Sequence, residues 1–132
     1  MSGRESHRVS NHYDRKTNAE AQRVVSRILG LKQFNNWVKS VLINDYAKSG
    51  YSVLDLCCGK GGDLKKFQHA KIAHLVGVDF SARSIQDMKE RFDTCIPPYR
   101  FEAKCIVGDV SDPGCAIDSV LPEFLEFDLV TC

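Results

Sequence analysis

The chain lacks net charge and long apolar runs. Its 132 residues include 18 lysines and arginines against 17 acidic residues, which leaves a net charge of +1. No positive field over the whole chain therefore attracts nucleic acid, and RNA binding would require a local cluster of basic residues. No stretch approaches the roughly 20 apolar residues that span a bilayer, and nothing before Val24 has the apolar segment of a secretion signal. These absences argue against a membrane or secreted protein.

The chain also lacks the cysteine spacings that are typical of metal sites. Its six cysteines are Cys57, Cys58, Cys95, Cys105, Cys115 and Cys132. They form no C-x-x-C pair and no cysteine–histidine pattern of a zinc site. Without an export signal, we expect reduced thiols in an intracellular protein and no metal. A chain of this length forms at most one domain with a modest core.

The residues before position 51 are predicted to form an arm followed by helices. Residues 1–16 are polar and show no period, which predicts a flexible N-terminal arm. The segment from Thr17 to Glu20 fits a capping box at the start of a helix, and Gly30 is the predicted stop of that helix. A second helix is predicted over residues 34–47.

From residue 51 onward, short apolar strands alternate with helices. Strands are predicted over 51–56, 73–80, 101–110 and 127–132, and helices over 63–69, 82–92 and 115–121. This alternation indicates an α/β fold with a parallel, doubly wound sheet. The last strand would be central, with half of the sheet beyond it missing, so we expect the chain to be a fragment.

A glycine-rich turn follows the first predicted strand, in the segment VLDLCCGKGGDLKKF (53–67). Cys57, Gly59 and Gly62 occupy the places of a G-x-G-x-x-G motif, with cysteine in the first place. Glycine permits the close backbone approach and the unusual dihedral angles of a ligand-binding turn. An ordinary tight turn is the alternative, but acidic residues around the turn argue for a ligand.

Acidic residues end three successive predicted strands. Asp79 can accept both hydroxyls of an adenosine ribose, Asp55 can accept amides of the turn, and Asp109 lies where an adenine would be. The pattern fits a nicotinamide dinucleotide and S-adenosylmethionine alike. Asp63 would repel a pyrophosphate at the helix N-terminus, whereas Asp55 suits a cationic sulfonium, which favours S-adenosylmethionine.

The segment FNNWVKSVLI (34–43) predicts a helix with two different faces. The apolar face carries Phe34, Trp37, Val38 and Val41, and the other carries Asn35, Asn36 and Lys39. The polar face is typical of a solvated surface, but its amides and ammonium could also donate to a base edge or a carboxylate. Basic side chains near the turn are Lys60, Lys65, Lys66 and Arg91, which could bind phosphate or be exposed helix charges.

Together these segments resemble the mRNA cap guanine-N7 methyltransferases. FNNWVKSVLI and VLDLCCGKGGDLKKF resemble two of that family's most specific motifs, NHYDRK (11–16) resembles its H-Y-N element, and FDLVTC (127–132) resembles the strand before its second H-Y element. The resemblance implies a Rossmann-like class I S-adenosylmethionine-dependent methyltransferase fold, truncated after the fourth strand. Residues 17–132 would form the N-terminal part of the mRNA cap methyltransferase domain.

The resemblance also implies a reaction and its residues. A methyl group would pass from S-adenosylmethionine to N7 of the guanine cap, with no catalytic side chain, because N7 carries a lone pair and no proton. The implied donor-binding residues are Lys39, Asp55, Cys57, Gly59, Asp79 and Asp109. The implied cap-binding residues are Asn35, Asn36, Lys60, Lys66 and Arg91, with weaker matches at His12 and Tyr13.

The implied partner is the capped 5′ end of mRNA (GpppN), together with other capping enzymes or transcribing RNA polymerase, in the nucleus. We expect the full-length protein to be the enzyme, and this chain alone to be inactive or to bind the donor only weakly. Three alternatives stay open: another S-adenosylmethionine-dependent methyltransferase, a nicotinamide-dependent oxidoreductase, and an inactive truncated isoform that acts as a binding module.

Overall fold

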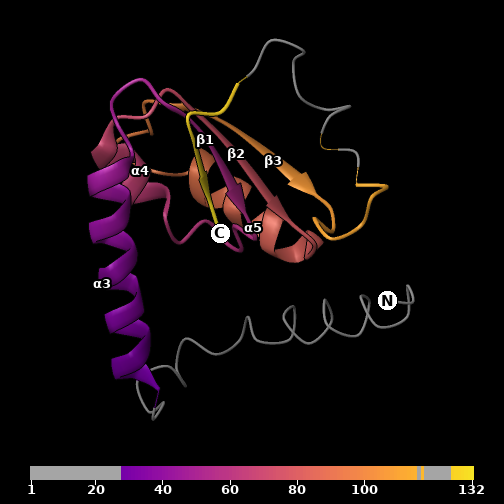
Figure 1. Ribbon diagram of the computed structural model, residues 1–132, viewed down its shortest axis with the longest axis horizontal. Coiled ribbons are helices and arrows are strands. Elements are labelled where there is room, and N and C mark those ends of the chain that lie inside the picture. The colour runs from indigo at the N-terminus through magenta and orange to yellow at the C-terminus, as the bar shows by residue number, and fades with distance from the viewer. Residues whose placement is uncertain (1–27, 116, 118–125) are drawn as a thin grey trace.

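The computed structural model describes residues 28–115, 117 and 126–132. Its elements are α3 (Leu29–Tyr46), β1 (Ser52–Leu56), α4 (Leu64–Ala70), β2 (His74–Asp79), α5 (Ala82–Asp93), β3 (Glu102–Val107) and β4 (Leu129–Thr131). The strands form one sheet in the order β3-β2-β1-β4, and every pair is parallel (Figure 1). This arrangement confirms the predicted α/β class. The predicted arm over residues 1–16, the capping box, and most of the helix predicted over 115–121 lie outside the described residues.

The register of the sheet brings the ends of all four strands to one edge. Leu56 at the end of β1 is opposite Val78 of β2, and Asp79 at the end of β2 is opposite Val107 of β3. On the other side of β1, Thr131 of β4 is opposite Asp55. Because the strands are parallel, the residues that follow them meet at this edge, where open α/β sheets bind their ligands.

One face of the sheet carries the helices and the larger part of the core. Its fully or nearly buried members include Val53 and Leu75 of the strands, Leu64 and Phe67 of α4, Met88 of α5, Ile43 of α3, and Ala47, which caps α3. Burying a side chain such as Phe67 contributes about 1.5–3 kcal/mol, which fixes α4 next to the glycine turn that precedes it. A smaller cluster of Val76, Val78 and Ile106 lies on the opposite face, as the alternation of side chains along a strand requires.

The structure corrects the prediction for Gly30 and shows which part of α3 is buried. Gly30 lies in the first turn of this helix and does not end one. The apolar face of α3 is largely exposed at its N-terminal end, where Phe34 and Trp37 are 58% and 60% exposed, whereas Ile43 and Ala47 at the other end are 5% and 3% exposed. Figure 1 shows why: the N-terminal part of α3 projects beyond the sheet, and only its C-terminal end packs on it. Periodicity identifies an apolar face but not the part of a helix that is covered.

The third strand ends earlier than predicted because the chain turns on its own side chains. After Val107, the Asp109 carboxylate accepts hydrogen bonds from the amide and the hydroxyl of Ser111, at 2.9 and 2.6 Å. Such Asx turns replace the strand ladder with local bonds. The other predicted strands, and the helices predicted over 63–69 and 82–92, agree with the structure to within two residues, whereas the helix predicted over 34–47 begins earlier, at Leu29.

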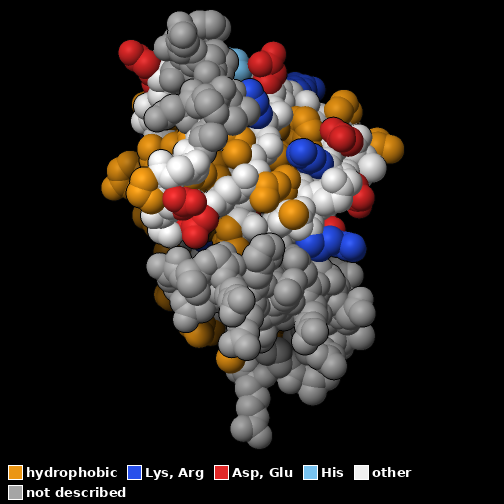
Figure 2. Space-filling model, turned by 90° about the vertical axis from the view of Figure 1, so that its right-hand side faces the viewer, with side chains coloured by type: hydrophobic (Ala, Val, Ile, Leu, Met, Phe, Trp, Pro, Cys, Tyr) orange, Lys and Arg blue, Asp and Glu red, His pale blue; other side chains and the backbone are white. Residues whose placement is uncertain are grey.

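The surface mixes charges of both signs with apolar side chains. Figure 2 shows acidic, basic and hydrophobic side chains interspersed over one face. Among the helices of the described ranges, none is both long enough and apolar enough to cross a membrane.

Candidate ligand-binding site

The glycine turn between β1 and α4 has a left-handed backbone at three positions. Cys57, Gly59 and Gly61 have φ angles of 58°, 57° and 75°. A Cβ at Gly61 would lie 2.8 Å from a side-chain atom of Leu64 and 2.9 Å from one of Met88. Gly59 and Gly62, which match the motif, have open space where a Cβ would be. The glycine that packing requires most is therefore Gly61, which the motif did not single out.

Asp79 holds the turn from the neighbouring strand. Its Oδ2 accepts from the Gly59 amide at 2.8 Å, and its Oδ1 accepts from the Ser81 amide at 2.9 Å. The residue is 7% exposed. Each carboxylate oxygen has a second lone pair, so Asp79 can still accept two hydroxyl groups from a ligand.

Asp55 has a different partner from the one that we predicted. Its Oδ1 accepts from the Thr131 hydroxyl of β4 at 2.9 Å, and the carboxylate that accepts an amide of the turn is that of Asp79. Burial raises the pKa of Asp55 to about 6, with help from the charges of Asp63 and Asp79 and against the Thr131 hydrogen bond and the Lys39 charge. Sequence reasoning missed Thr131 because this contact joins residues 76 positions apart.

The raised pKa of Asp55 makes a testable prediction about stability. The folded state binds this proton more tightly than the unfolded state, so its contribution is complete below the ordinary pKa of 3.8 and is lost as the pH rises through about 6. The loss amounts to about 3 kcal/mol at about 1.36 kcal/mol per pKa unit. We expect Asp55→Asn, which still accepts from Thr131, to raise the free energy of urea unfolding by up to about 3 kcal/mol at about pH 7.5 and to change it little near pH 4.

The control for this measurement is Asp112→Asn, because Asp112 lies on the exposed loop after β3. This variant should keep the pH profile of the parent chain. An Asp55→Asn variant with the same pH profile as the parent would contradict the raised pKa.

Asp63 joins α3 to the start of α4. One of its oxygens accepts from Lys39 Nζ at 3.1 Å, and the other accepts from Lys66 Nζ at 2.7 Å. Lys66 also donates to Asn36 Oδ1 at 2.7 Å and to the Gly62 carbonyl at 3.3 Å. Burial raises the pKa of Asp63, but the hydrogen bonds and charges of the two lysines outweigh burial and hold the pKa below its usual value. The polar face of α3 therefore faces the glycine turn.

Two cavities lie on either side of the Lys39–Asp63 ion pair. The turn cavity, about 450 Å³, lies between α3 and the glycine turn and is lined by Lys32, Asn35, Asn36, Lys39, Cys57, Cys58, Gly59, Gly62 and Asp63. The strand cavity, about 260 Å³, lies between α3 and β4 and is lined by Lys39, Leu42, Ile43, Tyr46, Asp55, Asp63, Leu129, Val130, Thr131 and Cys132. Lys39 and Asp63 line both cavities, so their ion pair forms the wall between them.

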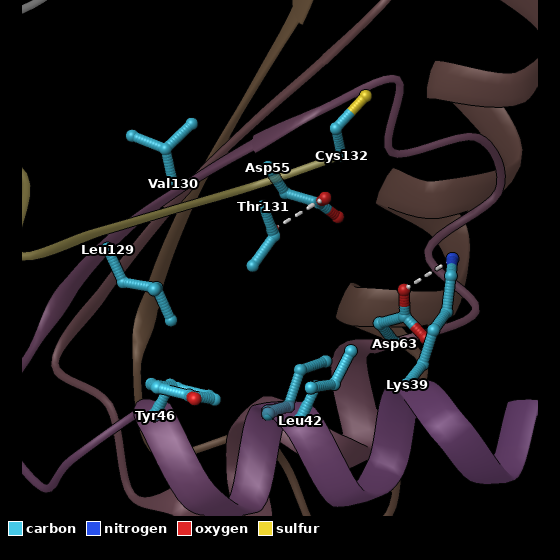
Figure 3. Close-up of a pocket in the computed structure, with 10 residues that line it drawn as sticks. Lys39, Leu42, Tyr46, Asp55, Asp63, Leu129, Val130, Thr131 and Cys132 are labelled. Atoms are coloured by element: carbon cyan, nitrogen blue, oxygen red, sulfur yellow. Dashed lines mark hydrogen bonds and ion pairs between the residues drawn. The ribbon is translucent and has the colours of Figure 1, made fainter.

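The charges around the two cavities fit a zwitterionic ligand. Figure 3 shows the Lys39 ammonium directed at the Asp63 carboxylate, with the Asp55 carboxylate also facing the strand cavity and Leu129 and Tyr46 on its apolar side. A ligand carboxylate can bind Lys39 while a ligand cation lies near the two acids. A pyrophosphate would meet two carboxylates and one ammonium. The electrostatics therefore favour an amino-acid-like ligand over a dinucleotide.

Two of the three basic residues predicted to bind the cap, Lys60 and Arg91, lie on the α5 side of the turn. Lys60 Nζ is 3.4 Å from Asp87 Oδ2, and Arg91 Nη1 donates to the Gly61 carbonyl at 3.4 Å. Lys66 differs from them, because its side chain is only 13% exposed and already donates to three acceptors. Lys66 thus bridges α3 and α4 and is not presented to solvent.

The remaining predicted residues fall into three groups. Asn35, Asn36, Cys57 and Gly59 line the turn cavity together. Asp109 lies after β3 at the same edge but lines neither cavity, and its hydrogen bonds from Ser111 lower its pKa. His12 and Tyr13 lie outside the described residues.

Within the part of the chain that the structure describes, no group of three or more histidine, cysteine or acidic residues is placed to hold a metal ion.

Known proteins match the chain in sequence. The family described as the mRNA (guanine-N(7))-methyltransferase domain matches residues 1–132. The chain is 39% identical over 132 residues to mRNA cap guanine-N(7) methyltransferase 1 of Arabidopsis thaliana and 41% identical over 131 residues to that of Oryza sativa subsp. japonica. Each alignment covers 95% of this chain and 35% of the relative, so the chain spans about a third of their length. The mRNA cap guanine-N(7) methyltransferase of Cryptococcus neoformans is 45% identical over 110 residues, which cover 79% of this chain and 18% of that protein.

Solved structures also match the fold. The glycopeptide N-methyltransferase MtfA, solved with sinefungin, has a TM-score of 0.52 at 15% identity over 70% of this chain and 34% of its own. The YcgJ protein from Bacillus subtilis has a TM-score of 0.51 at 17% identity over 70% of this chain and 35% of its own. At these identities the likeness shows the fold alone.

Proposed function

Because the chain belongs to the mRNA (guanine-N(7))-methyltransferase domain family, we propose that the protein transfers a methyl group from S-adenosylmethionine to N7 of the guanine cap of mRNA. The observation that carries this proposal is the polar face of α3, which meets the glycine turn across the Lys39–Asp63 ion pair. Family membership argues against a nicotinamide-dependent oxidoreductase. It equally argues against a methyltransferase that acts on an unrelated substrate.

In this proposal the donor lies over the glycine turn. Lys39 binds the donor carboxylate, Asp55 offsets the sulfonium charge, and Asp79 accepts the ribose hydroxyls. The backbone of Cys57 and Gly59 forms the floor, and the adenine lies toward Asp109, at the end of β3. These roles are supported by the register of the sheet, which brings the residues that follow β1, β2 and β3 together at one edge.

The cap binds on the side of α3 and α5. Asn35 and Asn36 contact the cap from the polar face of α3, while Lys60 and Arg91 bind the triphosphate from the α5 side. Lys66 acts with them by holding the Asn36 amide oxygen at 2.7 Å. Since N7 of guanine carries no proton, the residues orient the reactants and hold them close, and none acts as a general base. Binding through the triphosphate makes the affinity for capped RNA depend on salt.

The biological setting follows from the same proposal. The partner is the capped 5′ end of mRNA, with other capping enzymes or transcribing RNA polymerase as associates, and the site of action is the nucleus. Residues 17–132 form the N-terminal part of the catalytic domain.

A chimera tests the proposed reaction. The chain would be joined to the remaining two thirds of the Arabidopsis relative, and transfer of labelled methyl from S-adenosylmethionine to GpppG-capped RNA would be measured. We expect the chimera to methylate capped RNA at N7 and to leave uncapped RNA unmodified, and the chain alone to be inactive. A chimera that unfolds cooperatively but transfers no methyl group would contradict the reaction, and transfer by the chain alone would contradict the need for the remaining segment.

A further inference from the structure

Two exposed thiols lie at adjacent strand ends beside the site. Cys57 follows β1, Cys132 follows β4, and both are free and exposed. Asp55 is opposite Thr131 in the parallel pair. Cys132 is one residue beyond Thr131, and Cys57 is two residues beyond Asp55. A strand spacing of about 4.8 Å and an offset of one residue, about 3.3 Å along the strand, place the two Cα atoms about 5.8 Å apart, within the roughly 4.4–6.8 Å that a disulfide allows.

The two side chains also interact in the reduced state. Burial raises the pKa of the Cys57 thiol, and the charge and a side-chain hydrogen bond of Cys132 raise it further. The other four cysteines are less exposed, and Cys58 lies packed against Gly77, whose added Cβ would be 3.0 Å from the Cys58 sulfur. An oxidant in solvent therefore reaches Cys57 and Cys132 before the other thiols, while the raised pKa of Cys57 leaves less of it as the reactive thiolate.

Backbone geometry gives no reason for a cysteine at position 57. Its φ of 58° is left-handed, and a residue with a Cβ is less stable there than glycine by about 1–2 kcal/mol. Glycine would suit the turn better.

We propose that Cys57 and Cys132 form a reversible disulfide under oxidation by a peroxide, and that this disulfide blocks the donor site. Cys57 lines the turn cavity and Cys132 lines the strand cavity, next to Asp55 (Figure 3). A bridge between them crosses the boundary of the two cavities, where the donor lies in the proposed function. The blocking step rests on that proposed function, whereas formation of the disulfide does not.

Oxidation of the two thiols to a disulfide consumes one molecule of hydrogen peroxide. One thiolate attacks a peroxide oxygen, the O–O bond breaks, and a sulfenic acid and one water are formed. The second thiol attacks the sulfenic sulfur, the S–O bond breaks, and a second water leaves. The two thiols lose two electrons and two protons, and hydrogen peroxide is reduced to two waters. A dithiol reductant restores both thiols.

Peptide mapping of the 132-residue chain after treatment with hydrogen peroxide tests the proposal. We expect a Cys57–Cys132 linked peptide that dithiothreitol removes, and an affinity for S-adenosylmethionine that falls about tenfold or more on oxidation. Cys57→Ser and Cys132→Ser should each abolish the linked peptide, and Cys95→Ser should retain it.

Each contrary result has a separate meaning. A linked peptide from another cysteine pair, a disulfide between two chains, or a sulfinic acid at Cys57 in place of the bridge would overturn the proposed disulfide. A bridge that leaves donor affinity unchanged would overturn the blocking step. If the reduced chain binds no S-adenosylmethionine, the proposed function fails, while the linked peptide still decides the disulfide.

Discussion

Asparagine in place of Asp79 is expected to destabilise the fold by about 2–4 kcal/mol and to weaken donor binding by about 100-fold or more. The carboxylate accepts the amides of Gly59 and Ser81 through different oxygens, at 2.8 and 2.9 Å. An asparagine side chain has one oxygen and one NH₂ group. One of the two buried backbone amides would therefore face the NH₂ group, which cannot accept its hydrogen bond. The same change removes an acceptor for the ribose hydroxyls. Urea unfolding and titration with S-adenosylmethionine measure the two effects separately.

The matched control is Asp87→Asn on α5. Asp87 pairs with Lys60 and Arg83 at 3.4 and 3.2 Å near the surface, where ion pairs contribute about 0–1 kcal/mol. This variant should lose little stability and keep its donor affinity. An Asp79→Asn chain that matches the parent in both measurements would contradict the role of Asp79 in the turn and in the site.

Alanine in place of Gly61 is the second change with a large expected effect, about 2–5 kcal/mol of destabilisation. Its φ of 75° is left-handed, which costs a residue with a Cβ about 1–2 kcal/mol. The added Cβ would lie 2.8 Å from Leu64 and 2.9 Å from Met88, and such overpacking costs about 1–3 kcal/mol. Because both neighbours belong to the core, the turn itself would have to shift.

The neighbouring glycines provide matched controls for Gly61. A Cβ at Gly59 meets no atom within 4 Å, and its φ is 57°, so Gly59→Ala should show the backbone cost alone, about 1–2 kcal/mol. Gly62 has open space and no left-handed φ, so Gly62→Ala should change the free energy of unfolding by less than about 1 kcal/mol. Urea unfolding of the three variants should rank Gly61 first, Gly59 second and Gly62 last. A larger loss at Gly62 than at Gly61 would contradict the packing of the turn.

The fold could be predicted from the sequence because its signals are local. Short apolar strands alternate with helices along the chain, and each element is recognisable from its own residues. The match of the predicted strands to β1, β2 and β3 depends on nothing that lies far away in the sequence. The same holds for Asp79, which ends β2 and thereby reaches the edge of the sheet.

What the sequence could not supply depends on contacts between distant residues. The hydroxyl that binds Asp55 comes from Thr131 in β4, and pairing of β1 with β4 is needed to bring the two together. The central position of Asp63 requires that α3 lie beside α4, so that Lys39 and Lys66 converge on one carboxylate. The exposed apolar face of α3 likewise follows from its docking, which periodicity does not determine.

Titration of S-adenosylmethionine into the 132-residue chain, compared with titration of NADH, tests the central claim most directly. The zwitterionic arrangement of Asp55, Lys39 and Asp63 beside the glycine turn predicts saturable one-to-one binding of S-adenosylmethionine. It also predicts that Asp79→Asn weakens this binding and that NADH does not bind. Binding of NADH without binding of S-adenosylmethionine would contradict it.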